Sequence, residues 1–316
     1  MTDRSAMAQL ASELALAVRD EVLPMLGRHE GREHVGAAAA AAAGGGDVTF
    51  AIDERAEGLL ERFLAARAPD VAFYSEDRGM VSPRAEPAWV LVVDPIDGTR
   101  PAMAGLESAC VSVAAASLAS ELRMRDVEAA CIVEIKGGAM FSAVRGEPLD
   151  PAPRLSANTD LTRMFWAYGL RGRPARPTAE VLGELIDASS VGGATFDLGS
   201  ACFDLTRICT GQLDAYVEPG PRMIADVPGT RAEFERVGDG AVLNNSPYDL
   251  AAAVLCLEQG GAVVSDAYGR DLGGRPLLGS GVDFQISCVA AANRELHSRI
   301  CAAVDSGIER LVRKVD

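Results

Sequence analysis

Compact apolar runs and stretches of helical periodicity alternate along this chain. Apolar residues recur at helical spacing, or follow helix-capping residues, and predict helices over 6–26, 54–68, 178–186, 201–210, 249–259 and 293–312. Runs rich in β-branched and small apolar residues predict strands at 71–75, 89–93, 108–118, 127–135, 139–144, 262–265 and 286–290. The strands at 127–135 and 139–144, joined through Lys136-Gly-Gly138, are expected to form a hairpin.

Two polar stretches interrupt this pattern. Residues 28–46 contain seven consecutive alanines followed by three glycines, and they predict a mobile loop. His29 and His34 lie in this stretch, and zinc binding is the less favoured alternative because no other ligands are nearby. A proline-rich break at 150–160 divides an N-terminal α+β half, 1–150, from a C-terminal α/β half, 151–316. The halves are expected to form one continuous catalytic unit, with the metal site in the first and substrate-binding elements in the second.

Composition restricts the classes of partner. The chain has 316 residues and is 48% hydrophobic, enough for one large domain or two fused ones. The net charge of −15 argues against nucleic acid or an anionic membrane as the main partner, although bound metal can still attract an anionic small molecule. Seven scattered cysteines predict a reduced, cytoplasmic protein. No signal peptide and no apolar run of membrane-spanning length is recognisable.

The strand at 89–93 carries the strongest chemical signal. This run reads as a strand buried on both faces, and it ends in Asp94-Pro-Ile-Asp97-Gly-Thr99. Carboxylates at the mouth of a buried strand are costly unless they are paired or bound to a cation. No lysine lies nearby, so the pair indicates a hard divalent ion, and Mg²⁺ is the ion expected. A Ser-His-Asp site is disfavoured because the chain has three histidines and none lies near Gly-x-Ser-x-Gly.

The Asp94–Thr99 motif resembles the signature of the inositol monophosphatase family, Mg²⁺-dependent and lithium-sensitive sugar-phosphate phosphatases related to fructose-1,6-bisphosphatase. Further stretches resemble motifs of the same family: 47–57, Glu76-Asp77, 199–218 and 248–253. The resemblance spans roughly residues 5 to 312. It implies an α+β fold, a layered αβαβα sandwich of the sugar-phosphatase type, and a homodimer.

The resemblance also assigns roles to residues. Two or three Mg²⁺ ions would be held by Glu76, Asp94, the Ile96 carbonyl, Asp97 and Asp249. Thr99, hydrogen-bonded to a carboxylate, would orient a water molecule for in-line attack on phosphorus, and Glu76 and Asp53 complete the catalytic set. Substrate contacts are assigned to Gly98, Thr99, Arg100, Ser200, Ala201, Glu218 and Arg222.

Several of these roles have alternatives. Two roles are expected with equal weight for Asp53: it binds a water molecule of the metal site, or it only caps a helix. Glu218 is either a ligand of substrate hydroxyls or an exposed acid after an edge strand. For the third metal carboxylate, Asp226 lies at the usual family distance from Glu218, but Asp249 opens a helix of small residues and is preferred because such a helix start suits a phosphate site.

The segment 219–247 is longer than the corresponding part of the family by about two dozen residues. Both of its ends lie beside predicted site residues, Glu218 and Asp249. It is charged, punctuated by Gly and Pro, and predicts a lid without a core of its own, with Arg222 or Arg231 reaching the substrate. The alternative is a surface excursion without a role. The function predicted is a phosphatase for the monoester of a sugar, cyclitol or related metabolite. The alternatives are a bisphosphatase or nucleotide 3′-phosphatase, which needs extra cations in the pocket, and a non-catalytic metal-binding relative.

Overall fold

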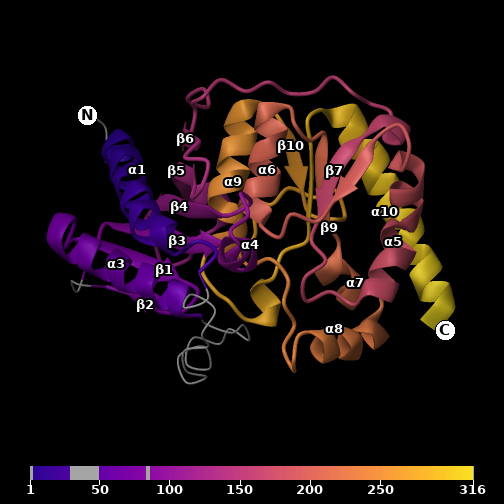
Figure 1. The fold of residues 1–316 in the computed structure, drawn as a ribbon, viewed down its shortest axis with the longest axis horizontal. Coiled ribbons are helices and arrows are strands. Elements are labelled where there is room, and N and C mark those ends of the chain that lie inside the picture. The colour runs from indigo at the N-terminus through magenta and orange to yellow at the C-terminus, as the bar shows by residue number, and fades with distance from the viewer. Residues whose placement is uncertain (1–2, 29–49, 83–85, 316) are drawn as a thin grey trace.

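The helices and strands form five layers (Figure 1), described by a computed structural model over residues 3–28, 50–82 and 86–315. Helices α1 (Asp3–Val22) and α3 (Ala51–Arg67) cover the outer face of a first sheet. Helices α6 (Ala201–Thr210) and α9 (Pro247–Gly260) lie between this sheet and a second one. Helices α5 (Ala175–Ser189) and α10 (Arg294–Val315) close the opposite side. The predicted α+β fold and αβαβα layering are therefore confirmed.

The first sheet contains six strands in the order β2-β1-β3-β4-β5-β6. Among the described strands of this sheet, only the pair β1–β3 is parallel, and β5 and β6 form the predicted hairpin. Its strands are β1 (Val71–Ser75), β2 (Gly79–Val81), β3 (Trp89–Asp97), β4 (Cys110–Ser117), β5 (Val127–Glu134) and β6 (Met140–Val144).

The second sheet contains five strands in the order β10-β11-β9-β7-β8, in which β7 pairs in parallel with both β8 and β9. Strand β9, which carries Glu218, is central, so the alternative of an edge strand there is wrong. The strands β7 and β8 are too short to stand out in the sequence. The members of this sheet are β7 (Phe165–Tyr168), β8 (Ala194–Phe196), β9 (Ala215–Glu218), β10 (Val263–Ser265) and β11 (Cys288–Ala291).

Helix α9 owes its place between the sheets to its composition. Every residue from Leu250 to Leu257 is buried, because both sides of the helix face a layer of the protein. A helix that is apolar all round is expected in such a position. The apolar residues of α1 and α3 form a second core against the first sheet, and α5 and α10 form a third against the second sheet. No helix among the described residues combines the length and the apolar character that a membrane span requires.

The segment 219–247 differs from its prediction. It contains two short helices, α7 (Gly220–Asp226) and α8 (Arg231–Val237), joined by the 3₁₀ turn η5 (Pro228–Thr230). Its apolar side chains enter the third core, where Phe234 is fully buried and Met223 and Val227 pack nearby. The segment therefore forms no separate core, but its widely spaced apolar residues are each buried by neighbouring elements, so it is not a structureless loop.

The remaining elements are short. Helix α4 (Thr99–Ala104) follows β3 after the single residue Gly98. Four further 3₁₀ turns, η1 (Leu23–Met25), η3 (Met124–Asp126), η4 (Leu161–Arg163) and η6 (Val282–Phe284), connect longer elements. The predicted loop with His29 and His34, and the Asp47–Thr49 part of one motif, lie outside the described residues.

Candidate metal-dependent active site

A β-bulge brings the two carboxylates of the Asp94–Asp97 motif to one side of the first sheet. On β3, Asp94 pairs with Ser112 and Asp97 with Cys110, so β3 carries one more residue than β4 over this interval. In a regular strand, residues three apart point to opposite faces, whereas one extra residue turns them to the same side. Pro95 lies within the bulge, where its missing N–H costs no ladder hydrogen bond.

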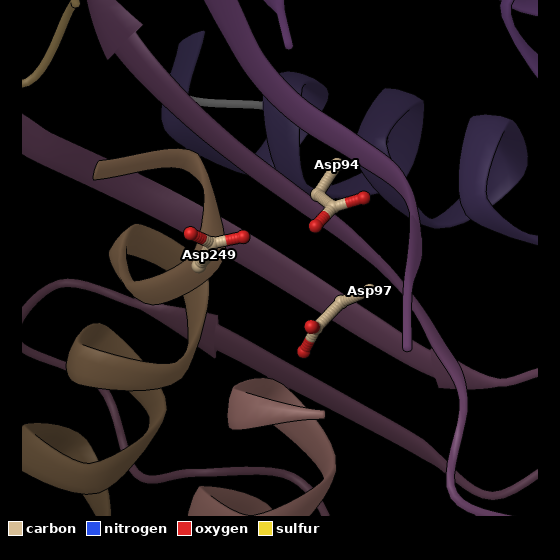
Figure 2. Close-up of side chains that lie close together, drawn as sticks. All are labelled: Asp94, Asp97 and Asp249. Atoms are coloured by element: carbon tan, nitrogen blue, oxygen red, sulfur yellow. The ribbon is translucent and has the colours of Figure 1, made fainter. Parts of the chain in front are cut away.

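Asp249 joins this pair from the other half of the chain. It is the third residue of α9 and accepts a hydrogen bond of 2.6 Å from the backbone N–H of Ser246, which closes the start of the helix. Figure 2 shows the three carboxylates turned toward one another, and an oxygen from each lies within 4.8 Å of the others. Asp226 lies elsewhere and accepts hydrogen bonds from Arg222 and from the Tyr268 hydroxyl.

The electrostatics of this cluster call for a cation. Burial and repulsion from Asp97, Asp249 and Glu76 raise the pKa of Asp94 well above its usual value. Burial and repulsion from Asp97 raise the pKa of Asp249 to about 7. Three converging carboxylates supply the oxygen ligands that Mg²⁺ and similar ions prefer. The donor set therefore fits a divalent metal, and Asp94, Asp97 and Asp249 would hold it.

Glu76 approaches the same place from β1. Because β1 and β3 are parallel, with Ser75 opposite Val93, the carboxyl ends of the two strands are adjacent. Glu76 and Ile96 both line the cavity that contains the three aspartates. Glu76 is not part of the group of oxygens within 4.8 Å, so its role as a metal ligand stays a prediction.

Thr99 and Asp53 are in direct contact. The Thr99 hydroxyl donates to Asp53 Oδ1 at 3.1 Å. The Ile96 carbonyl oxygen, at 3.2 Å, is a second acceptor within reach of the same hydroxyl. Asp53 Oδ2 also accepts from the backbone N–H of Phe50 at 3.0 Å. Asp53 therefore caps the start of α3, but as its third residue, because the helix begins at Ala51 and not at the predicted position 54. One carboxylate both stabilises the helix start and orients Thr99.

Gly98 and Ser200 pack the two halves together at this point. Gly98 has φ +92°, and a Cβ there would lie 2.6 Å from the Ser108 carbonyl oxygen and 2.9 Å from Ser200 Cβ. Only glycine fits. Ser200 caps α6 as predicted, and its hydroxyl donates to Asp97 Oδ2 at 2.8 Å. The backbone N–H of Cys202 donates to the same oxygen at 2.5 Å. Burial raises the pKa of Asp97, and these hydrogen bonds at the start of α6 oppose that rise because they favour the ionised carboxylate.

The cavity around these groups joins distant parts of the chain. One wall comes from residues up to Arg100, and the other comes from residues beyond 168. Besides Ser200 and Ala201, the second wall contributes polar residues that the sequence patterns did not indicate: Arg171, Arg173, Asp197, Asp204, Asn244 and Asn245. Arg171 and Arg173 follow β7, and recognising that four-residue strand would have drawn attention to them.

Two predicted substrate contacts lie outside this cavity. Arg222 donates to the carboxylates of Asp226 and Asp305 and to the Ala267 carbonyl, and its guanidinium stacks on Tyr268. It lines a different cavity, beneath α7, so the prediction that it reaches the substrate is corrected. These several partners hold the Arg222 side chain in place, whereas a lid residue would need a side chain that is free to move. Glu218 is fully buried and contacts Arg173.

Metal-free protein should lose stability as pH rises. An acid whose pKa is raised by folding destabilises the native state once it ionises, so the loss begins near pH 4 and is complete above about pH 7. Glu57, whose pKa burial raises to about 7, acts in the same direction. The unfolding free energy in EDTA should fall by roughly 1 to 3 kcal/mol between pH 5 and 8.

Urea denaturation with EDTA or with Mg²⁺ checks this expectation. Mg²⁺ should flatten the pH profile, and Asp249→Asn should flatten it without metal. Asp187→Asn, at an exposed position on α5, is the matched control and should keep the wild-type slope. Identical slopes in EDTA and in Mg²⁺ would contradict the proposed repulsion.

Comparisons with known proteins agree with this geometry. A sequence model described as the inositol monophosphatase family matches residues 3–309. A fructose-1,6-bisphosphatase/inositol-1-monophosphatase from Methanothermobacter thermautotrophicus is 25% identical over 308 residues, covering 94% of this chain and 95% of that protein. An inositol-1-monophosphatase from Mycobacterium leprae is 30% identical over 234 residues, covering 68% and 75%. The structure of suhB from Bartonella henselae superposes with a TM-score of 0.71 at 20% identity, covering 96% and 99%.

Proposed function

The chain belongs to the inositol monophosphatase family of phosphatases, and on this premise we propose that it hydrolyses a phosphate monoester of a sugar, cyclitol or related small metabolite with Mg²⁺. The observation that carries the proposal is the cluster of Asp94, Asp97 and Asp249 beside the Thr99–Asp53 hydrogen bond. A non-catalytic metal-binding protein would need the carboxylates but not the Thr99–Asp53 hydrogen bond beside them.

The residues act at three places in this proposal. Mg²⁺, when bound, would lower the pKa of a bound water molecule and would neutralise charge on the phosphate and the leaving group. The Thr99 hydroxyl donates a hydrogen bond to Asp53. A lone pair on Thr99 Oγ1 therefore remains to accept a hydrogen bond from the attacking water and to orient it. The backbone N–H groups of Gly98 and Thr99 hold the phosphate. Ser200 holds Asp97 in place through its hydrogen bond.

A panel of phosphate esters, assayed for phosphate release with and without Mg²⁺, tests the proposal. We expect release that depends on Mg²⁺ for at least one small monoester. Release no faster than that of the Asp94→Asn variant, across the whole panel, would overturn it. The homodimer, the cytoplasmic location and the lack of a nucleic-acid partner stay predictions, the last supported by the net charge of −15.

Thr99 gives a prediction with an internal control. Thr99→Val keeps the shape of the side chain but removes the hydroxyl, and should lower kcat about 100-fold, the usual scale for a positioned proton-transfer group. Thr99→Ser keeps the hydroxyl that reaches Asp53 and should retain most of the activity. Steady-state kinetics with saturating Mg²⁺ checks both, and equal losses in the two variants would show that packing, rather than the hydroxyl, matters.

A further inference from the structure

Arg173 is held beside the active site by several partners, yet its Nε–H has no acceptor among the residues that the structure describes. Its Nη1 donates to the Arg171 carbonyl at 2.6 Å, and its Nη2 donates to Asn245 Oδ1 at 3.1 Å and contacts Glu218. Its Nε is buried. The side chain is 8% exposed and lines the cavity that holds the metal carboxylates. A buried N–H of this kind is costly without an acceptor.

The surroundings of Arg173 fix its position. Gly169 lies against it, and a Cβ at Gly169 would come within 3.4 Å of Arg173 Cζ and 3.0 Å of Glu218 Oε2. The amide of Asn245, which accepts from Arg173, donates in turn to the Tyr216 hydroxyl at 2.9 Å. A guanidinium held on several sides is preorganised for a ligand and loses little side-chain freedom on binding.

Glu218 is not available for the role that the family resemblance assigns to it. Its side chain is 0% exposed, one oxygen accepts from the Gly220 N–H at 2.7 Å, and the other contacts Arg173. Arg173 lines the cavity and Glu218 does not. The side chain presented to a substrate at this position is therefore the positively charged guanidinium of Arg173. The family resemblance had instead predicted the carboxylate of Glu218, which would accept from a substrate hydroxyl.

We propose that Arg173 is a specificity-determining residue that binds a second acidic group of the substrate, either a carboxylate or a second phosphate. This inference rests on the proposed phosphatase function and narrows its substrate class. The planar guanidinium matches both kinds of anion. Arg171 and Arg100 line the same cavity and add positive charge near the site. Glu218 neutralises Arg173 in the free protein, so an acidic ligand competes with Glu218 for the guanidinium.

Three substrates separate the possibilities: fructose 1,6-bisphosphate with a second phosphate, 3-phosphoglycerate with a carboxylate, and glycerol 3-phosphate with neither. Arg173→Gln alone would leave Glu218 buried without its partner, so the double variant Arg173→Gln/Glu218→Gln is the main test. It should lower kcat/KM for at least one diacidic substrate about 10- to 100-fold more than for glycerol 3-phosphate, the scale of a charge-assisted hydrogen bond. Which diacid responds identifies the acidic group.

Glu218→Gln gives an effect of the opposite sign. It releases Arg173 from its internal partner and should raise kcat/KM for the same diacidic substrate. Arg299→Gln, which breaks an exposed pair with Glu295 on α10, is the matched control and should change nothing. If the double variant alters all three substrates by one common factor, or Glu218→Gln lowers activity on the diacids, the inference is overturned.

A binding measurement separates this inference from the proposed function. Isothermal titration calorimetry with Ca²⁺ in place of Mg²⁺ compares the affinities of the three compounds for wild-type protein and the double variant. Selective weakening of the diacids supports the inference whether or not the wild type hydrolyses them. Absence of hydrolysis by the wild type counts against the proposed function, and unselective binding with normal hydrolysis counts against Arg173 alone.

Discussion

Replacing Asp94 by Asn is expected to lower Mg²⁺-dependent phosphate release at least about 1,000-fold, because the charge that holds the cation is removed at its centre. Asp94 is repelled by Asp97, Asp249 and Glu76, and its Oδ1 accepts the Ile96 N–H at 3.0 Å. An amide has the same size and keeps that acceptor. The variant should therefore fold, and without metal it should be more stable than the wild type.

Two measurements on the same preparation check this expectation. Initial rates at saturating Mg²⁺ give the loss of activity, and thermal unfolding in EDTA gives the change in stability. Asp187→Asn, at an exposed position on α5, makes the same chemical change far from the cavity and should be silent in both. If Asp94→Asn retains more than a few per cent of the wild-type rate, the metal assignment is wrong.

Phe234→Ala is expected to destabilise the protein by about 3 to 5 kcal/mol, because truncating a fully buried aromatic side chain leaves a cavity that neighbours fill only in part. The side chain belongs to the third core, together with residues of α5 and α10. Guanidinium denaturation measures the effect. Val237→Ala on the same helix α8, at a side chain that is 37% exposed, is the control and should cost less than about 1 kcal/mol.

This result would also decide how the segment 219–247 can be manipulated. Replacing 222–244 by a short Gly-Ser link would remove Phe234, Met223 and the Arg222–Asp305 ion pair together. We expect such a protein to lose its fold, whereas removal of a detachable lid would leave the metal site intact. A loss below about 1 kcal/mol for Phe234→Ala would instead favour the lid.

Local patterns were sufficient for much of the fold and for the metal carboxylates. The run from Trp89 to Val93 and the two aspartates after it lie next to each other in the sequence, so their chemistry could be predicted together. Asp249 could be chosen over Asp226 because the small residues that follow it permit close packing of a helix. The structure places Asp249, and not Asp226, beside Asp94 and Asp97.

Other features depend on contacts between distant residues and left no local pattern. Phe234 is separated from Met223 by a proline and a glycine, and a single buried aromatic residue has no periodicity. The burial of Glu218 is a consequence of its central place in the second sheet and of Arg173, which lies 45 positions earlier in the chain. The bulge between Asp94 and Asp97 likewise requires the pairing with β4 to be known.

The division of the cavity between two parts of the chain has an evolutionary consequence. Glu76, Asp94, Asp97 and Thr99 lie within one stretch, 76–99, and Asp249 lies at the start of α9, whereas the loop from Gly169 to Arg173 follows β7 in the second sheet. Mutations in that loop can accumulate in a duplicated gene without displacing the groups that hydrolyse the ester. A lineage can thus acquire a new substrate through a few codons, while selection continues to preserve the older chemistry across the cavity.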